Sequence, residues 1–194
     1  MPEMLDGRVQ RRMRSREAVV DAVLDLLTEG HAHLTAPQVS ARSGVSTRSI
    51  FRLFDDMTSL YRAAAARQAE RLDALLAPLA DDGPLAARIA ALVANRAEVY
   101  ETVSPVRRAA VRLAPASPEI ASELARVAGL LRAQAAGTFR AELAGAGPGV
   151  LDAVDLLTSW EAWERLRTTQ GLAAREAAAT LRGALAALLD DVDT

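Results

Sequence analysis

Residues 34–54 read LTAPQVSARSGVSTRSIFRLF, and this stretch decides the fold. Thr35 and Gln38 have the spacing of a capping box, in which two side chains accept hydrogen bonds from each other's backbone N–H groups at a helix start. Gly44 can adopt the left-handed backbone that ends a helix, and Ser46 is a favourable cap for the next one. The pattern therefore predicts a short helix, a tight turn and a second short helix.

The second of these helices, over about residues 47–54, has two unlike faces when its residues are placed 100° apart. Ile50 and Leu53 lie on one side, which we expect to pack inward. A short helix with a polar outer face, held by a turn against a preceding helix, is what a helix-turn-helix uses to read the DNA major groove. An ordinary helical hairpin with a solvated face fits the spacing equally well. The outer face carries a hydroxyl group, two guanidinium groups and an aromatic ring, from Thr47, Arg48, Phe51 and Arg52.

A longer amphipathic helix is expected before this pair, over about residues 15–29, with Gly30 as its stop. Just ahead of it, residues 8–16 hold five Arg and no acidic residue. We interpret this segment as a basic arm that contacts phosphates or enters a narrow minor groove. A disordered, solvated tail is the alternative.

Net charge does not by itself point to a nucleic-acid partner, because the chain carries −2 at pH 7 and its pI is about 5.8. The distribution of charge is more informative than the sum. Residues 1–54 carry a net charge of +2, which leaves −4 for the remainder of the chain. The basic part is therefore the part that contains the expected helix-turn-helix.

Composition favours an all-α protein. Hydrophobic residues make up 51% of the 194 residues and aromatic residues only 4%, so the core is built mainly from Ala, Leu and Val. The absence of Cys excludes disulfides and thiolate chemistry and suits a reducing cytoplasm, where we expect the protein to reside. No run approaches the ~18 apolar residues of a membrane span, and no signal peptide is recognisable, so no membrane association is expected.

The periodicity of the remaining sequence predicts six more helices, about nine in total. We expect an amino-terminal three-helix DNA-binding head over residues 1–56 and a larger carboxy-terminal helical bundle over residues 57–194. Prolines and glycines supply the expected breaks between the helices. The six helices are expected at about 56–77, 84–103, 105–113, 117–143, 150–169 and 173–189.

The stretch from Leu34 to Phe54, with the Asp-Asp-Met-Thr-Ser-Leu that follows it, resembles the amino-terminal domain of the TetR family of bacterial transcriptional regulators. The match covers roughly residues 15–61, and Gly44-Val45-Ser46 and Leu60 are among its most specific positions. The resemblance implies a homodimer that binds double-stranded DNA at a palindromic operator. Together with the basic arm, it makes the following residues candidates for DNA contact: Arg11, Arg12, Arg14, Thr35, Gly44, Val45, Ser46, Thr47, Arg48, Phe51 and Arg52.

Two positions depart from the family pattern. The family commonly has Tyr where this chain has Phe51, and Lys where it has Met57, and both usual residues contact phosphate. Without the Lys, we expect the slope of log affinity against log salt to be shallower by about one unit. These changes and the acidic balance motivate an alternative, a small-molecule- or protein-binding helical module whose DNA binding is weakened or lost.

The last two expected helices carry wide apolar surfaces. The resemblance implies that they form a four-helix bundle with their copies in a second chain, although the same stripes would also suit a monomeric core. The candidate dimerisation residues are Val154, Leu157, Leu181, Leu185 and Leu188.

The body is also expected to bind a small-molecule effector of unknown identity. By the family resemblance, its binding would move the two heads away from the ~34–36 Å spacing of successive major grooves and relieve repression. Such pockets are built from a few polar groups in an apolar helical bundle. Core packing would explain the same residues equally well. The candidate ligand-binding residues are Asn95, Tyr100, Trp160 and Trp163.

Signals for enzymatic chemistry are sparse. No phosphate-binding loop or nucleophile motif is present. The two His residues, His31 and His33, stand without other metal-ligating residues nearby in the sequence. We therefore expect no catalytic residues, no metal site and no cofactor.

Overall fold

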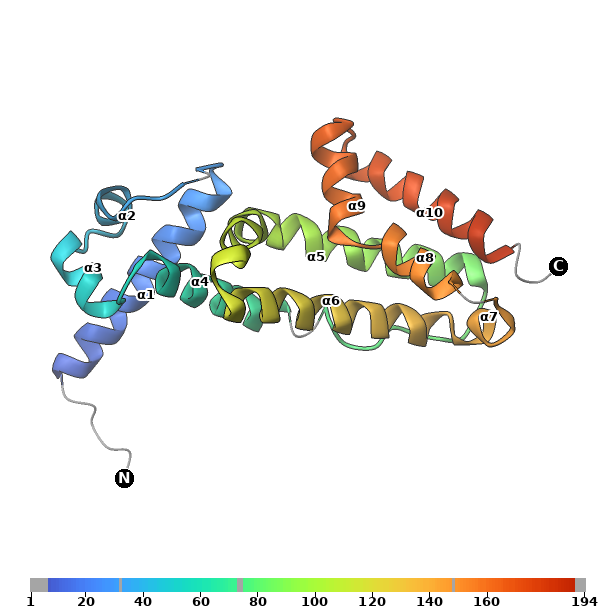
Figure 1. The fold of residues 1–194 in the computed structure, drawn as a ribbon, viewed down its shortest axis with the longest axis horizontal. Coiled ribbons are helices and arrows are strands. Elements are labelled where there is room, and N and C mark those ends of the chain that lie inside the picture. Colours follow the sequence, from blue (N-terminus) through green and yellow to red (C-terminus); the bar gives the residue numbers. More distant parts are fainter. Residues whose placement is uncertain (1–6, 32, 73–74, 148, 191–194) are drawn as a thin grey trace, which may run out of the picture. The chain divides into compact units, whose positions relative to one another are not determined.

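The computed structural model describes residues 7–31, 33–72, 75–147 and 149–190, and all of its regular elements are helical (Figure 1). No strand occurs among these residues, which confirms the all-α prediction. The α-helices are α1 (Gly7–Thr28), α2 (Ala36–Ser43), α3 (Thr47–Leu53), α4 (Met57–Leu72), α5 (Leu85–Leu113), α6 (Pro118–Thr138), α7 (Arg140–Gly145), α8 (Val150–Leu157), α9 (Trp160–Glu164) and α10 (Ala174–Asp190). A 3-10 turn, η1 (Ala114–Ala116), follows α5, and a π-helical turn, η2 (Arg165–Thr169), follows α9.

The chain folds into two compact units. The first, which we call the head, consists of Met1–Arg71 and Pro105–Ser122, and the second, the body, of Leu72–Ser104 and Glu123–Thr194. The packing of the head therefore continues beyond residue 56 and includes most of α4. The division of the chain into a DNA-binding part up to residue 56 and a ligand-binding and dimerisation part after it stays a prediction.

The head is built around a single apolar core. Val19 and Val23 of α1, Val39 of α2 and Ile50 of α3 are all buried in it, and Leu60 of α4 closes it. Each of these residues belongs to the apolar stripe of its helix, and none of the helices α1–α3 buries its stripe without the others. The core therefore sets how the helix-turn-helix is held.

Residues 34–54 adopt the structure that their local signals predict. Thr35 Oγ1 accepts a hydrogen bond from the Gln38 N–H, and Gln38 Oε1 accepts one from the Thr35 N–H at 2.8 Å, which completes the capping box. Gly44 ends α2 with a φ of +70°, the left-handed region that favours glycine. Ser46 then caps α3.

The expected start of the first helix near residue 15 is wrong, because α1 begins at Gly7 and extends without a break to Thr28. The basic segment is the first two turns of this helix. Arg, Gln and Met are strong helix formers, so the segment can be helical without an apolar face of its own. The predicted stop at Gly30 is confirmed, with Gly30 at a φ of +91°.

The predicted break between Ser104 and Pro105 is also wrong, because α5 continues through Pro105 to Leu113. Proline removes one intrahelical hydrogen bond. Val103 is buried in the core of the body and Val106 in the core of the head, so the helix is anchored on both sides of the proline. Burial of Val103 and Val106 offsets the hydrogen bond that Pro105 removes.

The expected helix over 117–143 is divided at Phe139 into α6 and α7. The reason lies in a side chain from α5. Arg88 Nη1 donates a 2.8 Å hydrogen bond to the Thr138 carbonyl, which would otherwise accept an N–H from the next helical turn. Arg88 also forms a largely buried ion pair with Glu142 of α7.

The expected helix over 150–169 is divided as well. Ser159 adopts an extended backbone and its hydroxyl accepts the Ala162 N–H at 3.1 Å, so it caps α9 after α8 has ended. The Thr158 carbonyl accepts the Tyr100 hydroxyl at 2.6 Å. By contrast, α10 is confirmed to within one residue at each end.

The fourth helix is shorter than expected, because α4 ends at Leu72 rather than near residue 77. Past it, the carbonyls of Leu75 and Ala77 accept hydrogen bonds from side-chain amides of α5 and α6. These bonds replace the helical partners that the two carbonyls would otherwise need. No helix in the described part of the chain is both long and apolar enough to span a membrane.

Replacement of Gly44 by Ala tests the turn of the helix-turn-helix. Because a β-carbon is strained at a φ of +70°, we expect Gly44→Ala to cost about 1 kcal/mol and to lower Tm by about 2–4 °C in thermal unfolding. Gly129→Ala, inside α6 with open space around the added carbon, is the matched control and should stabilise the protein. Equal effects of the two substitutions would contradict this account of the turn.

The ion pair between Arg88 and Glu142 predicts a pH dependence of stability. Hydrogen bonds from Arg88 lower the pKa of Glu142 below its ordinary 4.5. The contribution of the pair is therefore complete above the unfolded-state pKa and is lost as pH falls through the lower folded-state pKa. We expect Glu142→Gln to cost about 1–3 kcal/mol at pH 7 and the difference from wild type to shrink as pH is lowered below about 4.5.

Urea unfolding between pH 7 and pH 3 measures this effect. Glu123→Gln is the control, because Glu123 pairs with Arg126 within one exposed helix face. Exposed pairs of this kind contribute about 0.5 kcal/mol or less. A difference between Glu142→Gln and wild type that does not change with pH would refute the assignment.

Candidate functional site

The turn between α2 and α3 fixes how the outer face of α3 is presented. Ser46 Oγ accepts the Ser49 N–H at 3.3 Å and donates to Ser49 Oγ at 3.0 Å. Val45 is half-buried and packs against the core of the head. The start of α3 is therefore held by an apolar anchor and a side-chain cap.

The outer face of α3 is exposed as its sequence predicts. Arg48 and Arg52 are exposed, the Phe51 side chain is 51% exposed, and Thr47 is half-buried. Ile50 is buried on the opposite side. An aromatic ring left half in water costs favourable burial, so Phe51 is a feature of this face that the core does not require.

An open groove of about 770 Å³ lies between the first turns of α1 on one side and α3 with the turn before it on the other. It brings Arg11 and Arg12 to the same surface as Arg52, forty residues further along the chain. Four guanidinium groups and no carboxylate belong to the residues that line it, so the groove is positively charged. The lining residues are Arg8, Arg11, Arg12, Ser15, Gly44, Val45, Ser46, Ser49, Arg52 and Leu53.

Several candidate DNA-contacting residues do not line the groove. Thr35 uses its side chain in the capping box of α2. Arg14 is exposed on α1, and Arg48 and Phe51 are exposed on α3. Their contact with DNA stays a prediction that depends on the outer face of α3 and on the flank of α1.

Two other arginines of the head have structural partners. Arg42 makes two hydrogen bonds of 2.8 and 2.6 Å to Glu29, which lower the pKa of that carboxyl. Arg16 donates to the Leu53 carbonyl and lies over the Phe54 ring, with 4.5 Å between its Cζ atom and the ring centroid. Both residues therefore hold the head together.

Arg8 and Ser15 belong to the predicted basic arm but were not named among the candidate DNA-contacting residues, and Ser49 was missed altogether as a residue of the groove. Ser49 follows Ser46 by one helical turn, and this spacing was the available signal. Arg8 and Ser15 become recognisable only once α1 is known to begin at Gly7. Met57, where the family pattern has Lys, is half-buried and packs against the core of the head.

The four candidate ligand-binding residues of the body are all buried, and the polar group of each has a partner. Tyr100 donates its hydroxyl to Thr158, and the Trp160 indole donates to Ser104 Oγ at 2.9 Å. Asn95 binds the Leu75 carbonyl through its Nδ2 at 2.7 Å. Their contact with a ligand stays a prediction, because these bonds are also what core packing requires.

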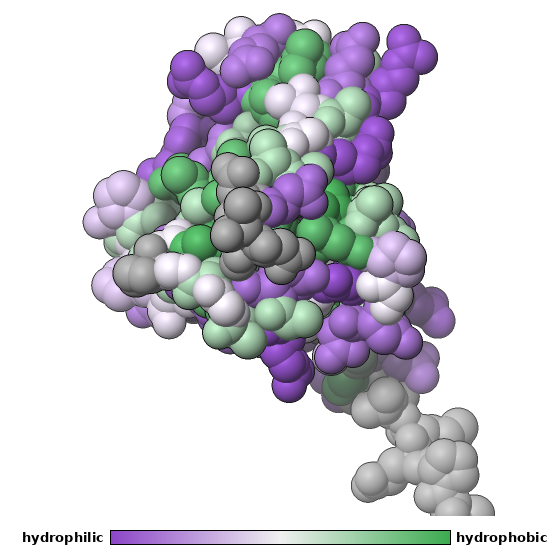
Figure 2. All heavy atoms as spheres, turned by 90° about the vertical axis from the view of Figure 1, so that its right-hand side faces the viewer, coloured by the Kyte–Doolittle hydropathy of each residue, from purple (hydrophilic) through white to green (hydrophobic). Residues whose placement is uncertain are grey.

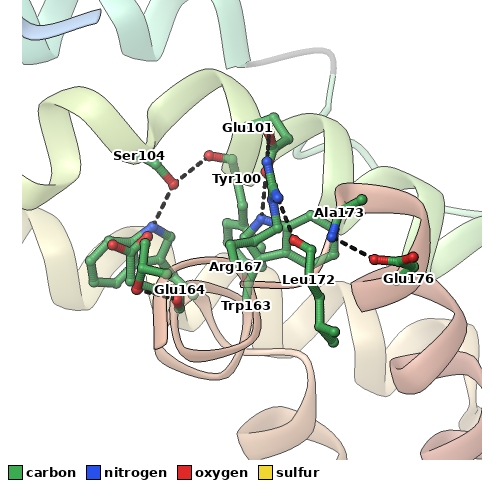
Figure 3. Close-up of polar contacts among 11 residues, drawn as sticks. Tyr100, Glu101, Ser104, Trp163, Glu164, Arg167, Leu172, Ala173 and Glu176 are labelled. Atoms are coloured by element: carbon green, nitrogen blue, oxygen red, sulfur yellow. Dashed lines mark hydrogen bonds and ion pairs between the residues drawn. The ribbon is translucent and has the colours of Figure 1, made fainter. Parts of the chain in front are cut away.

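Glu101 joins α5 to α9 and η2 in this region. One of its oxygens accepts both the Trp163 indole at 2.9 Å and Arg167 Nε at 2.8 Å. Arg167 also donates to the Leu172 carbonyl, and the Tyr100 and Trp163 rings pack at a tilt with their centroids 6.3 Å apart. The cluster fixes the π-helical turn against α5 (Figure 3).

Arg96 of α5 was not predicted as a site residue, yet its environment is the most unusual in the body. Its side chain is completely buried, and burial lowers the pKa of its guanidinium. Arg96 Nη1 donates to Asn95 Oδ1 at 2.7 Å and to Gln134 Oε1 at 2.5 Å, and Nη2 donates to the Leu131 carbonyl. Nε has no acceptor, and every acceptor of the other nitrogens is neutral.

Three of the candidate dimerisation residues lie inside their own chain. Val154 of α8 and Leu181 and Leu185 of α10 are buried in the core of the body, while Leu157 and Leu188 are half-buried beside it. A dimer surface on these helices therefore has to use neighbouring residues. Leu156, 69% exposed on α8, is the large apolar side chain most exposed among the described residues.

The end of the body that carries α7 and the last turn of α10 faces the viewer in Figure 2. Both apolar side chains, in green, and polar ones, in purple, are exposed on this end. No group of three or more metal-ligating side chains among the described residues could hold a metal ion.

Comparisons with known proteins show which fold this is. No protein-family model matches the chain, and no curated protein matches it. Among solved structures, a transcriptional regulator from Rhodococcus sp. Rha1 superposes with a TM-score of 0.71 at 16% identity, over 92% of this chain and 98% of that one. A TetR-family transcriptional regulator from Streptomyces coelicolor superposes with a TM-score of 0.70 at 20% identity, over 92% and 81%. The chain thus has the fold of the TetR-family transcriptional regulators.

Proposed function

We propose that this protein is a homodimeric DNA-binding transcription regulator, a repressor that leaves a palindromic operator when a small molecule binds its body. The observation that carries the proposal is the groove of the head. It places Arg8, Arg11, Arg12 and Arg52 beside the turn of a helix-turn-helix, in a fold shared with transcriptional regulators.

The arrangement divides the work of DNA recognition between two surfaces. The guanidinium groups of the groove would bind phosphate oxygens, which sets the position of the head on the duplex. The exposed Arg48 and Phe51 of α3 would then face base edges, Arg48 as a donor to guanine and Phe51 against a thymine methyl group. The negative net charge of the chain does not oppose this, because the attractive charge is concentrated where DNA would lie.

Substitution of the arginines separates the two surfaces. We expect Arg11→Ala and Arg12→Ala each to weaken binding to all sequences and to reduce the slope of log affinity against log salt by about one unit. Arg48→Ala should instead cost about 1–3 kcal/mol on the preferred operator and relax its sequence preference. Fluorescence titration of labelled DNA from upstream of the protein's own gene, at several salt concentrations, measures both effects.

Arg42→Ala is the matched control, because Arg42 is paired with Glu29 and does not line the groove. It should leave the salt slope unchanged. A wild-type protein that shows no sequence-specific, salt-dependent binding at physiological salt would sink the proposal. That outcome would favour a helical binding module without DNA function.

Dimerisation is supported by an exposed apolar surface on the last helices. Leu156 projects from α8 into solvent, and α10 exposes the small residues Ala179, Gly183 and Ala187 at four-residue spacing. Small side chains let the backbones of two helices approach closely, and the exposed Leu156 supplies apolar area. We propose that this surface meets its copy in a second chain.

Charged substitutions test the surface. We expect Leu156→Glu and Gly183→Glu each to raise the Kd of the dimer by at least about tenfold, equivalent to about 1.4 kcal/mol. Leu130→Glu on α6, which also replaces an exposed leucine, should leave the dimer intact. Light scattering over a range of protein concentrations gives the Kd, and a dimer unaffected by both substitutions would exclude this surface.

A further inference from the structure

Among the described residues, no carboxylate forms an ion pair or a hydrogen bond with Arg96; Asp155 of α8, which is paired with Arg132, acts on its charge only through space. The residue is completely buried, and its described partners are two amide oxygens and one main-chain carbonyl. Neutral acceptors offset only part of the hydration that an ion loses on burial. Buried charges in proteins are generally paired with an opposite charge, and an unpaired one is strongly destabilising.

The hydrogen-bonding capacity of Arg96 is also incompletely used. A guanidinium group has five N–H donors. The two of Nη1 are taken by Asn95 and Gln134, and one of Nη2 by the Leu131 carbonyl. The Nε donor and one Nη2 donor remain, which is the number that a carboxylate accepts when it binds a guanidinium through both oxygens.

The side chains around Arg96 are mainly apolar. Leu92 and Val93 precede Arg96 on α5, Val99 follows it, and Leu131 and Ala135 flank Gln134 on α6; all five are buried in the body core. A molecule that reaches the guanidinium therefore enters apolar surroundings. Such sites bind compounds with a large apolar part and a small number of polar groups.

We propose that Arg96 is the anion-recognising group of the effector site, and that the effector is a carboxylate attached to an apolar body. This inference rests on the proposed regulation by a small molecule. It assigns the site to Arg96 and Gln134, in addition to the predicted Asn95.

The same network offers a route from the ligand to the rest of the chain. Asn95 and Gln134 each accept a hydrogen bond from Arg96, and each donates one to the Leu75 carbonyl. A carboxylate on Arg96 competes with the two amide oxygens for the guanidinium. The amides would then change their hold on the segment that directly follows α4 in the chain, and α4 is the helix that leaves the helix-turn-helix.

Thermal unfolding of the full-length protein with matched acids and amides tests the proposal. The probes are octanoate and 4-phenylbutyrate, each compared with its neutral primary amide. At about 100-fold above its Kd, an acid that binds the native state should raise the midpoint by about 5–10 °C. We expect this rise with at least one acid, and at least about tenfold weaker binding of its amide.

Substitutions of Arg96 assign the preference to this residue. Arg96→Met should abolish the difference between acid and amide, whereas Arg88→Met should retain it, because Arg88 is a buried arginine already paired with Glu142. Arg96→Lys keeps the charge but loses the paired donors, so it should bind the acid at least about tenfold more weakly than wild type. Should Arg96→Met fail to fold, the comparison of wild type with Arg96→Lys decides.

Three outcomes overturn the proposal: no acid stabilises the protein, acid and amide stabilise it equally, or the preference for acid survives in the Arg96 variants. These outcomes differ from a failure of the proposed function. Specific DNA binding is measured on the same preparation without any acid, and acid binding is measured without DNA. Each result therefore stands independently of the other.

Discussion

The body of the protein depends on hydrogen bonds that two arginines of α5 donate to the antiparallel helix beside it. Arg88 binds the last carbonyl of α6 and the carboxylate of α7, and Arg96 binds the carbonyl of Leu131 and the amide of Gln134. Because each guanidinium makes several directional bonds, the two together fix how far α6 is shifted along α5. The end of α6 and the position of the segment after α4 both follow from that register.

Short-range signals in the sequence predicted the helix-turn-helix almost residue by residue. The capping box at Thr35, the glycine at residue 44 and the serine at residue 46 act on backbone groups within a few residues, so their effect is readable without knowledge of the fold. The same holds for α10, whose start is capped by Glu176. Where the bond partners are local, sequence and structure agree.

Where the deciding partner is distant in the chain, the sequence misleads. Pro105 reads as a helix break, but core packing on both sides carries the helix through it. From the sequence, Phe139 is expected inside a helix. Arg88, however, donates to the Thr138 carbonyl, which would otherwise accept a main-chain N–H from the next helical turn. Ser159 did carry a local signal, a hydroxyl followed by Glu161 in the first turn of α9, yet the continuous apolar stripe around it concealed the new start.

The candidate site residues show the same contrast between what local sequence reveals and what depends on distant parts of the chain. Arg11, Arg12 and Arg52 were found from charge and from the reading face, although only the fold shows that they share a groove. Arg96 could not be found, since an arginine in an Ala-rich amphipathic helix looks like any solvated residue until its burial is known. Because α1 begins at Gly7, Arg8, Arg11 and Arg12 belong to a helix instead of a free tail, and the backbone that carries them is helical without any bound anion. Binding therefore loses little backbone entropy in this region, unlike that of a basic tail that must fold on its target.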